Sequence, residues 1–112
     1  MFNRIVFLLL FFCYFSASAS FLPATEDIPL MDGITLTESS DFLFDTPSGQ
    51  ILTLFATTQK EVQDIRIFYH ETLLSLGWHK KSTDFYVRDN DTFQLTFPQK
   101  NEVRFDILLS NN

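Results

Sequence analysis

The chain has 112 residues, and its 14 acidic and 8 basic side chains give a formal net charge of −6. An excess of acidic groups repels the phosphates of nucleic acids and of anionic membrane surfaces, so both are unfavourable partners. One domain with a single modest core fits this length, and the lone cysteine, Cys13, has no second thiol in the chain to pair with.

The first 19 residues have the features of a secretory signal peptide. Arg4 precedes an uninterrupted apolar run over residues 5–15, and small residues follow up to Ala19. We predict cleavage between Ala19 and Ser20 and export of the remainder. The alternative is that residues 5–22, which carry no charge, stay attached as an anchor in the inner membrane.

Residues 20–40 are predicted to form an extended lead-in without regular structure, because they contain Pro23, Pro29 and Gly33. Leu30 and Met31 lie within this segment. They are expected either to close one end of the core or to form a docking patch for a partner. The folded domain is then predicted over residues 41–112.

Two strands are predicted in the first half of this domain. Residues 41–45 place Phe42 and Phe44 on one face, and Pro47 and Gly49 favour a tight turn directly afterwards. Residues 50–57 follow as a second strand. This strand is apolar on both faces, which is typical of a central strand.

Residues 58–76 are predicted to form an amphipathic helix. Thr58 and Glu61 match a capping box, in which each side chain bonds the backbone amide of the other residue. Gly77 is suited to end the helix, because glycine adopts a left-handed conformation without steric strain. One face of the helix is apolar and needs a packing partner; it consists of Val62, Ile65, Tyr69, Leu73 and Leu76.

The rest of the chain is predicted to contain three strands. One lies within residues 78–88 and is clearest at 84–88, and residues 92–97 and 102–109 alternate between apolar and polar side chains. Asp89, Asn90 and Asp91 indicate a hairpin turn. The order ββαβββ, with short turns and one amphipathic helix, predicts an α+β two-layer sandwich whose sheet is mainly antiparallel.

The sequence after residue 19 shows no recognisable catalytic, cofactor-binding or metal-ligating pattern. His70 and His79 lack the spacing of a zinc site, and no G-x-S-x-G or glycine-rich phosphate loop occurs. Asp45 and Asp106 are carboxylates beside apolar runs, but a turn and an outward strand position account for them. We therefore expect a protein that is not an enzyme and uses no cofactor.

Two aromatic residues bear most directly on function. Trp78 follows the predicted helix stop, and it is expected either to close the end of the core or to lie at a surface. Tyr86 lies on the strand face opposite Phe85 and Val87. An outward-facing Tyr86 would make the open face of the sheet a binding surface.

Three stretches of the sequence resemble a group of small exported proteins of alphaproteobacteria. They are DIPLM at residues 27–31, FDTPSGQI at 44–51 and F-Y-x-x-T-L-x-x-L-G-W at 68–78. The resemblance extends over nearly the whole chain after the signal peptide. It implies a periplasmic domain, and it implies no activity or catalytic residue.

Together these features predict a small exported domain that binds or scaffolds a protein of the bacterial cell envelope. The predicted interaction surface consists of Leu30, Met31, Trp78 and Tyr86. One alternative is a small periplasmic ligand-binding domain or hydrolase whose site the sequence does not show. Another is the same domain held at the membrane by an uncleaved N-terminal helix.

Overall fold

The computed structural model describes residues 20–37 and 42–111, so the predicted signal peptide lies outside the described residues. The fold is α+β: a helix packs against an antiparallel seven-stranded sheet. The elements in chain order are β1 (Ile34–Leu36), β2 (Phe42–Thr46), β3 (Gly49–Thr58), α2 (Val62–Ser75), β4 (His79–Ser82), β5 (Phe85–Arg88), β6 (Asp91–Thr96) and β7 (Glu102–Ser110).

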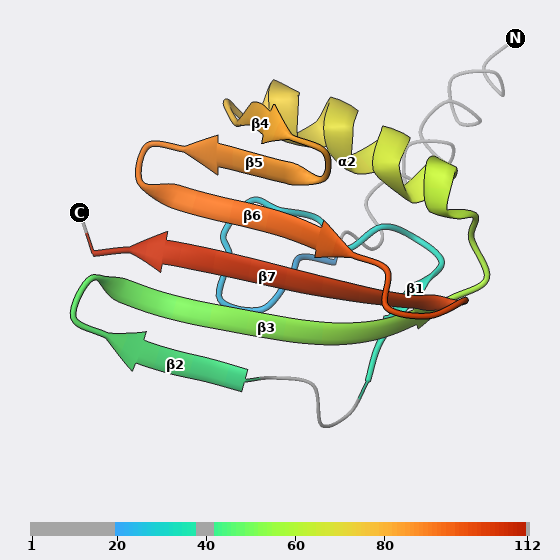
Figure 1. Cartoon of the computed structure of the whole chain (residues 1–112), viewed down its shortest axis with the longest axis horizontal. Helices are drawn as coiled ribbons and strands as arrows, with labels where there is room; N and C mark the ends of the chain where they lie inside the picture. The colour runs from blue at the N-terminus through green and yellow to red at the C-terminus, as the bar shows by residue number, and fades with distance from the viewer. Residues whose placement is uncertain (1–19, 38–41, 112) are drawn as a thin grey trace, which may run out of the picture.

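The strands of the sheet lie in the order β1-β3-β7-β6-β5-β4, with β2 also paired to β3 (Figure 1). β1 and β2 occupy the same side of β3, because β1 pairs with residues 56–58 and β2 with residues 49–53. The sheet therefore has one edge formed by β1 and β2 and an opposite edge formed by β4.

The helix and the segment before β1 lie on the same face of the sheet (Figure 1). We call this the covered face, and its buried strand residues are Leu52, Leu54, Ala56, Tyr86, Phe93, Leu95, Val103, Phe105 and Ile107. On the other side lies the open face, on which no described element packs. Its strand residues include Phe44, Ile51, Thr53, Phe85, Val87, Thr92, Gln94, Arg104, Asp106 and Leu108.

Tyr69 joins the three parts of the core. Its ring lies 5.6 Å from the ring centroids of both Phe93 and Phe105 on the sheet. Its hydroxyl donates to the Pro29 carbonyl oxygen at 2.9 Å and accepts from the Met31 amide at 3.1 Å. The helix, the sheet and the lead-in are therefore held together by one side chain.

The lead-in contributes to the core at more positions than Leu30 and Met31, the two that the sequence interpretation considered. Leu22 and Ile28 are each 1% exposed, and β1 forms within the segment predicted to lack regular structure. One helix cannot cover a seven-stranded sheet, so these apolar residues cover the part that α2 leaves free. Leu30 and Met31 are half-buried and pack against the core, in agreement with the first of their two predicted roles.

The predicted helix start was wrong. Thr58 is the last residue of β3, and its hydroxyl donates to the Gly33 carbonyl oxygen and accepts from the Lys60 amide, both at 2.9 Å. The helix begins at Val62, and Glu61 occupies the N-cap position without a side-chain cap bond. The Thr58 hydroxyl is taken by contacts near β1, so it cannot form the capping box with Glu61.

The predicted helix end is confirmed. Gly77 has a φ of 92° and follows Leu76, the C-cap residue. The Trp78 amide donates to the Leu73 carbonyl oxygen at 2.9 Å, and the Gly77 amide donates to that of Leu74 at 3.2 Å. These are the two bonds of a Schellman motif. The motif turns Trp78 into the core, where its ring is buried. The guanidinium carbon of Arg88, Cζ, lies over this ring, 4.7 Å from the ring centroid.

The predicted strand order ββαβββ needs correction, because it omits β1 and merges β4 with β5. β4 and β5 form a hairpin whose turn includes Asp84 at a φ of 60°. The sequence of β4, HKKS, contains no apolar residue and so shows no strand period. The turn at Asp89 and Asn90, between β5 and β6, is confirmed.

Candidate functional site

None of the four predicted interaction residues is exposed. Trp78 and Tyr86 are buried, and Leu30 and Met31 are half-buried against the core. Tyr86 lies on the covered face, where its hydroxyl is 2.8 Å from His70 Nδ1 on the helix. Tyr86 therefore does not face outward, and the condition under which it would have made the open face a binding surface is not met.

Phe85 and Val87, and not Tyr86, occupy the open face of β5. They pair across the sheet with Gln94 and Thr92 respectively, which also lie on that face. Strand alternation correctly separates Tyr86 from Phe85 and Val87, but it does not say which side the helix covers. His70 supplies a partner for the Tyr86 hydroxyl, which makes the buried position favourable for tyrosine.

An apolar row crosses the open face at right angles to the strands. Phe44 pairs with Ile51, Ile51 with Leu108, and Leu108 with Thr92, which in turn pairs with Val87. We define the apolar row as Phe44, Ile51, Leu108 and Val87. Phe44 is 59% exposed and Ile51 is 39% exposed. Neighbouring strands lie about 4.8 Å apart, so the row spans about 19 Å from β2 to β5.

A charged network borders the apolar row on the same face. Asp106 accepts from the Thr53 hydroxyl at 3.0 Å and from Arg104 Nε at 2.9 Å. Arg104 also lies 5.5 Å from the ring centroid of Phe55. The open face thus combines an apolar stripe with polar groups that already have hydrogen-bond partners.

Asp45 and Asp106, the two carboxylates noted in the sequence, have separate local partners. Asp45 is exposed near the end of β2 and accepts from Gln50 Nε2 at 3.2 Å. Asp106 is held by Thr53 and Arg104 on β3 and β7. The structure does not bring the two carboxylates into one site.

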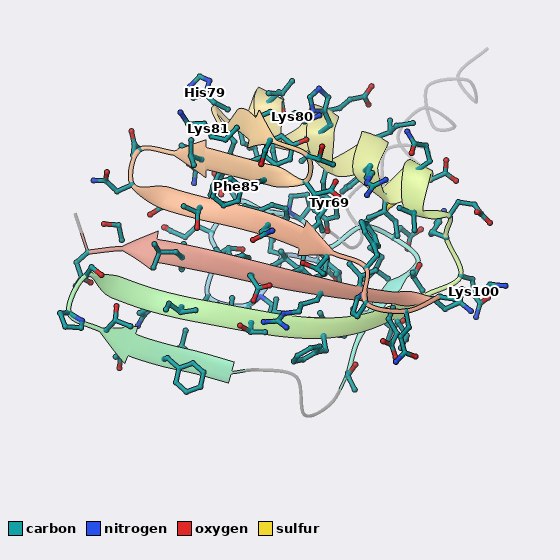
Figure 2. All side chains as sticks on the ribbon, viewed as in Figure 1. Tyr69, His79, Lys80, Lys81, Phe85 and Lys100 are labelled. Carbon is teal, nitrogen blue, oxygen red and sulfur yellow. The ribbon has the colours of Figure 1, made fainter. Side chains whose placement is uncertain are left out.

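The two edges of the sheet differ in chemistry. At one edge, β2 exposes Leu43 and Phe44, which point to opposite faces of the strand. At the other, all four residues of β4 are exposed, and Figure 2 shows Lys80 and Lys81 along it beside the helix. Lysine on an edge strand opposes pairing with another strand, whereas the exposed apolar residues of β2 offer no such barrier.

A shallow cavity of about 320 Å³ lies between α2 and the β4–β5 hairpin. Arg66 Nε donates to both Asp84 carboxylate oxygens at 3.0 Å, and His70 bonds Tyr86. Burial, and secondarily the negative charge of Asp84, raise the pKa of Tyr86 above its usual value. Tyr86 is therefore a neutral phenol at physiological pH, and Lys80 completes the wall of the cavity.

Within residues 20–37 and 42–111, no group of three or more His, Cys, Asp or Glu side chains is close enough to hold a metal ion. In the same part of the chain, no helix has the length and hydropathy to cross a membrane. No protein-family model, curated protein or solved structure matches the chain.

Proposed function

We propose that this chain is an exported, non-enzymatic domain that binds a protein of the bacterial cell envelope through the open face of its sheet. The observation that carries the proposal is the apolar row, Phe44, Ile51, Leu108 and Val87. Arg4, the apolar run of residues 5–15 and the small residues up to Ala19 support export.

The apolar row is unusual for a sheet face that contacts water. Solvated faces of antiparallel sheets normally carry polar side chains, as Thr92 and Gln94 do on β6. Here apolar residues from β2, β3 and β7 lie side by side in the same register. Phe44, Ile51 and Leu108 form the contiguous part of the row, and Thr92 separates them from Val87. An apolar patch with a polar border is the usual composition of a protein interaction site. Arg104 and Asp106 form such a border.

A pair of matched variants tests the binding surface. Ile51 on the open face and Val62 on the helix are both β-branched and both 39% exposed. We expect Ile51→Asp to abolish crosslinking to the envelope partner in intact cells and Val62→Asp to preserve it. Both variants should keep the circular dichroism spectrum of the parent. Equal crosslinking by the two variants would refute the open face as the binding surface.

Export has an independent test. N-terminal sequencing of the protein recovered from the envelope should begin at Ser20, after cleavage of the predicted signal peptide. A retained N-terminus would instead support the membrane-tethered alternative, in which residues 5–22 stay in the inner membrane.

A second candidate function is binding of a small polar ligand in the cavity beside α2. The observation that favours it is the convergence of His70, Tyr86, Arg66 and Lys80 on one concave site. A panel of small polar metabolites should then contain one that raises the melting temperature of the parent. The same compound should not stabilise a His70→Ala variant. An equal stabilisation of both proteins would place the compound elsewhere.

A further inference from the structure

The outer side of β2 carries backbone groups that no described residue pairs with. β2 and β3 form a hairpin closed by Thr46 and Gly49. The Asn111 amide donates to the Ser48 carbonyl oxygen at 3.1 Å. In an antiparallel ladder a bond at this position flanks a non-hydrogen-bonded pair, that is, two opposite residues whose backbone groups do not bond each other; here the pair is Gly49 and Ser110. The backbone amide and carbonyl groups of Gly49 therefore point toward β2. The pair that closes the hairpin, Thr46 and Gly49, is consequently hydrogen-bonded.

This alternation determines which groups of β2 face outward. Phe44, like Thr46, bonds to β3, because hydrogen-bonded pairs recur at every second residue. Leu43 and Asp45 lie between them, and their amide and carbonyl groups point away from β3. An unpaired row of this kind is a template for another strand.

We propose that β2 pairs antiparallel with β2 of a second copy of this chain. The two-fold axis passes beside Phe44, so that the Phe44 residues of the two copies lie opposite each other. Leu43 of each copy then lies opposite Asp45 of the other, and reciprocal backbone hydrogen bonds form on both sides of the axis. The two sheets become one continuous sheet.

Charge selects this register over its neighbour. Centring the pair on Asp45 instead would also bond the outward-facing groups, but it would place the Asp45 side chains of the two copies directly opposite each other. Like charges directly opposite each other destabilise a strand pair. In the proposed register Asp45 faces Leu43, and the Phe44 side chains form an aromatic pair on the open face.

The same symmetry explains why a second copy is favoured over an unrelated strand. A two-fold axis perpendicular to the sheet keeps both open faces on one side. The apolar rows of the two copies then meet at Phe44 and form one longer row. The longer row enlarges the surface offered to the envelope partner, so this use of the dimer rests on the proposed function. The strand pairing itself does not depend on the proposed function.

Sedimentation of the purified exported protein tests the dimer. We expect reversible, concentration-dependent association that strengthens with salt, because each copy has a net negative charge. Leu43→Asp, which would lie opposite Asp45 of the other copy, should make the protein monomeric, whereas Leu74→Asp on the helix should leave association unchanged. The two leucines are 48% and 45% exposed, so the comparison isolates their positions.

A second variant removes only the outward backbone donor. Leu43→Pro deletes an amide that points away from β3, so the hairpin should survive while the dimer is lost. If this variant does not fold, Leu43→Asp still decides the result. A protein that stays monomeric at all concentrations would overturn the proposal. So would association that weakens with salt and is lost in Lys81→Glu, because it would indicate head-to-tail pairing of β2 with β4.

Disulfide trapping tests the register. The sequence after residue 19 contains no cysteine. With oxidised glutathione as the oxidant, Phe44→Cys should form a covalent dimer, because directly opposite residues in a non-bonded pair lie within disulfide range. Asp45→Cys should not. Dimerisation of Leu43→Cys alone would overturn the proposed register.

The outcomes separate the dimer from the proposed function. Ile51→Asp should lose the envelope partner and still sediment as a dimer, whereas Leu43→Asp should lose the dimer. The parent protein could prove monomeric while its partner binding is still lost in Ile51→Asp. That result would overturn the dimer and leave the proposed function intact. Capture of a foreign peptide by β2 in place of a second copy would also overturn the dimer.

Discussion

Phenylalanine is buried on one face of the sheet and exposed to solvent on the other. Phe93 on the covered face is fully buried, and its ring contacts those of Tyr69, Trp78, Tyr86 and Phe105. On the open face, Phe44 is mostly exposed to solvent. The difference shows that apolar side chains in strands can either be buried in the core or remain at the surface, where we propose a role in recognition. Only the placement of the helix and the lead-in distinguishes the two roles.

The two faces also differ in the environment of their polar atoms, which are buried on the covered face and in contact with water on the open face. Tyr69 and Tyr86 each bury a ring and direct a hydroxyl to a partner on another element, Pro29 or His70. Among the described residues, Trp78 Nε1 is the buried side-chain polar atom without a hydrogen-bond partner. On the open face, the charges of Arg104 and Asp106 remain partly hydrated. The covered face should therefore be far more sensitive to substitution.

Truncating one phenylalanine on each face gives the largest expected contrast. Phe93→Ala should lower the free energy of unfolding by about 3–5 kcal/mol, because it removes buried ring contacts and leaves a cavity. A loss of this size is a large part of the stability of a small domain. Phe44→Ala should change it by no more than about 0.5 kcal/mol. Urea unfolding at low protein concentration measures both, and similar losses would contradict the assignment of the two faces.

Removing one hydroxyl from the core should have an intermediate effect. Tyr69→Phe leaves the Pro29 carbonyl and the Met31 amide without their partner, which should lower the free energy of unfolding by about 1–3 kcal/mol. It should also speed proteolytic cleavage within residues 20–33, which the hydroxyl anchors. Tyr86→Phe is the control, because half-buried His70 can bond to water instead. A larger loss from Tyr86→Phe would contradict the central role of Tyr69.

Alkaline pH should weaken the covered face selectively. Burial raises the pKa of Tyr69, and burial with the Asp84 charge raises the pKa of Tyr86. Above pH about 10 the unfolded tyrosines lose protons that the folded ones keep, so stability falls as pH rises and is fully present below that pH. Each tyrosine should contribute up to about 1.4 kcal/mol per pH unit.

The alkaline effect is measured by urea unfolding across a pH series. Tyr69→Phe should reduce the slope of stability against pH, since it removes one of the two groups. The phenolate absorbance of the folded protein should stay low until unfolding begins. Early ionisation of both tyrosines in the folded protein would show that neither hydroxyl is buried.

Several parts of the fold could be predicted because local sequence determines them. Gly77 ends the helix in any context, and the alternation in residues 92–97 and 102–109 places Phe93 and Phe105 on one face. The start of the helix depended on tertiary contacts, because the Thr58 hydroxyl donates to the Gly33 carbonyl oxygen. β1 is three residues long and forms only because β3 is beside it.

The candidate site could not be predicted in the same way. Ile51 and Leu108 are far apart in the sequence, and only the pairing of β3 with β7 makes them neighbours. The apolar character of both faces of β3 correctly predicted a central strand, but it did not predict that one face would stay open. Alternation assigns residues to two faces without saying which face is covered. That information depends on the helix and on the lead-in, of which the sequence interpretation considered only Leu30 and Met31 as core residues.

The smallest expected effect compares an ion pair on each side of the sheet. Arg104 and Asp106 lie on the open face, whereas Arg66 of α2 pairs with Asp84 in the turn between β4 and β5. Because both pairs are partly exposed, each should contribute less than about 1 kcal/mol. Asp84→Asn should lower stability more than Asp106→Asn, since Asp84 is better shielded from solvent and asparagine tolerates its positive φ equally well. Urea unfolding at low and high salt measures both, and high salt should narrow the difference. A greater loss from Asp106→Asn would mean that the open face depends on its charges for stability, contrary to its proposed role as a binding surface.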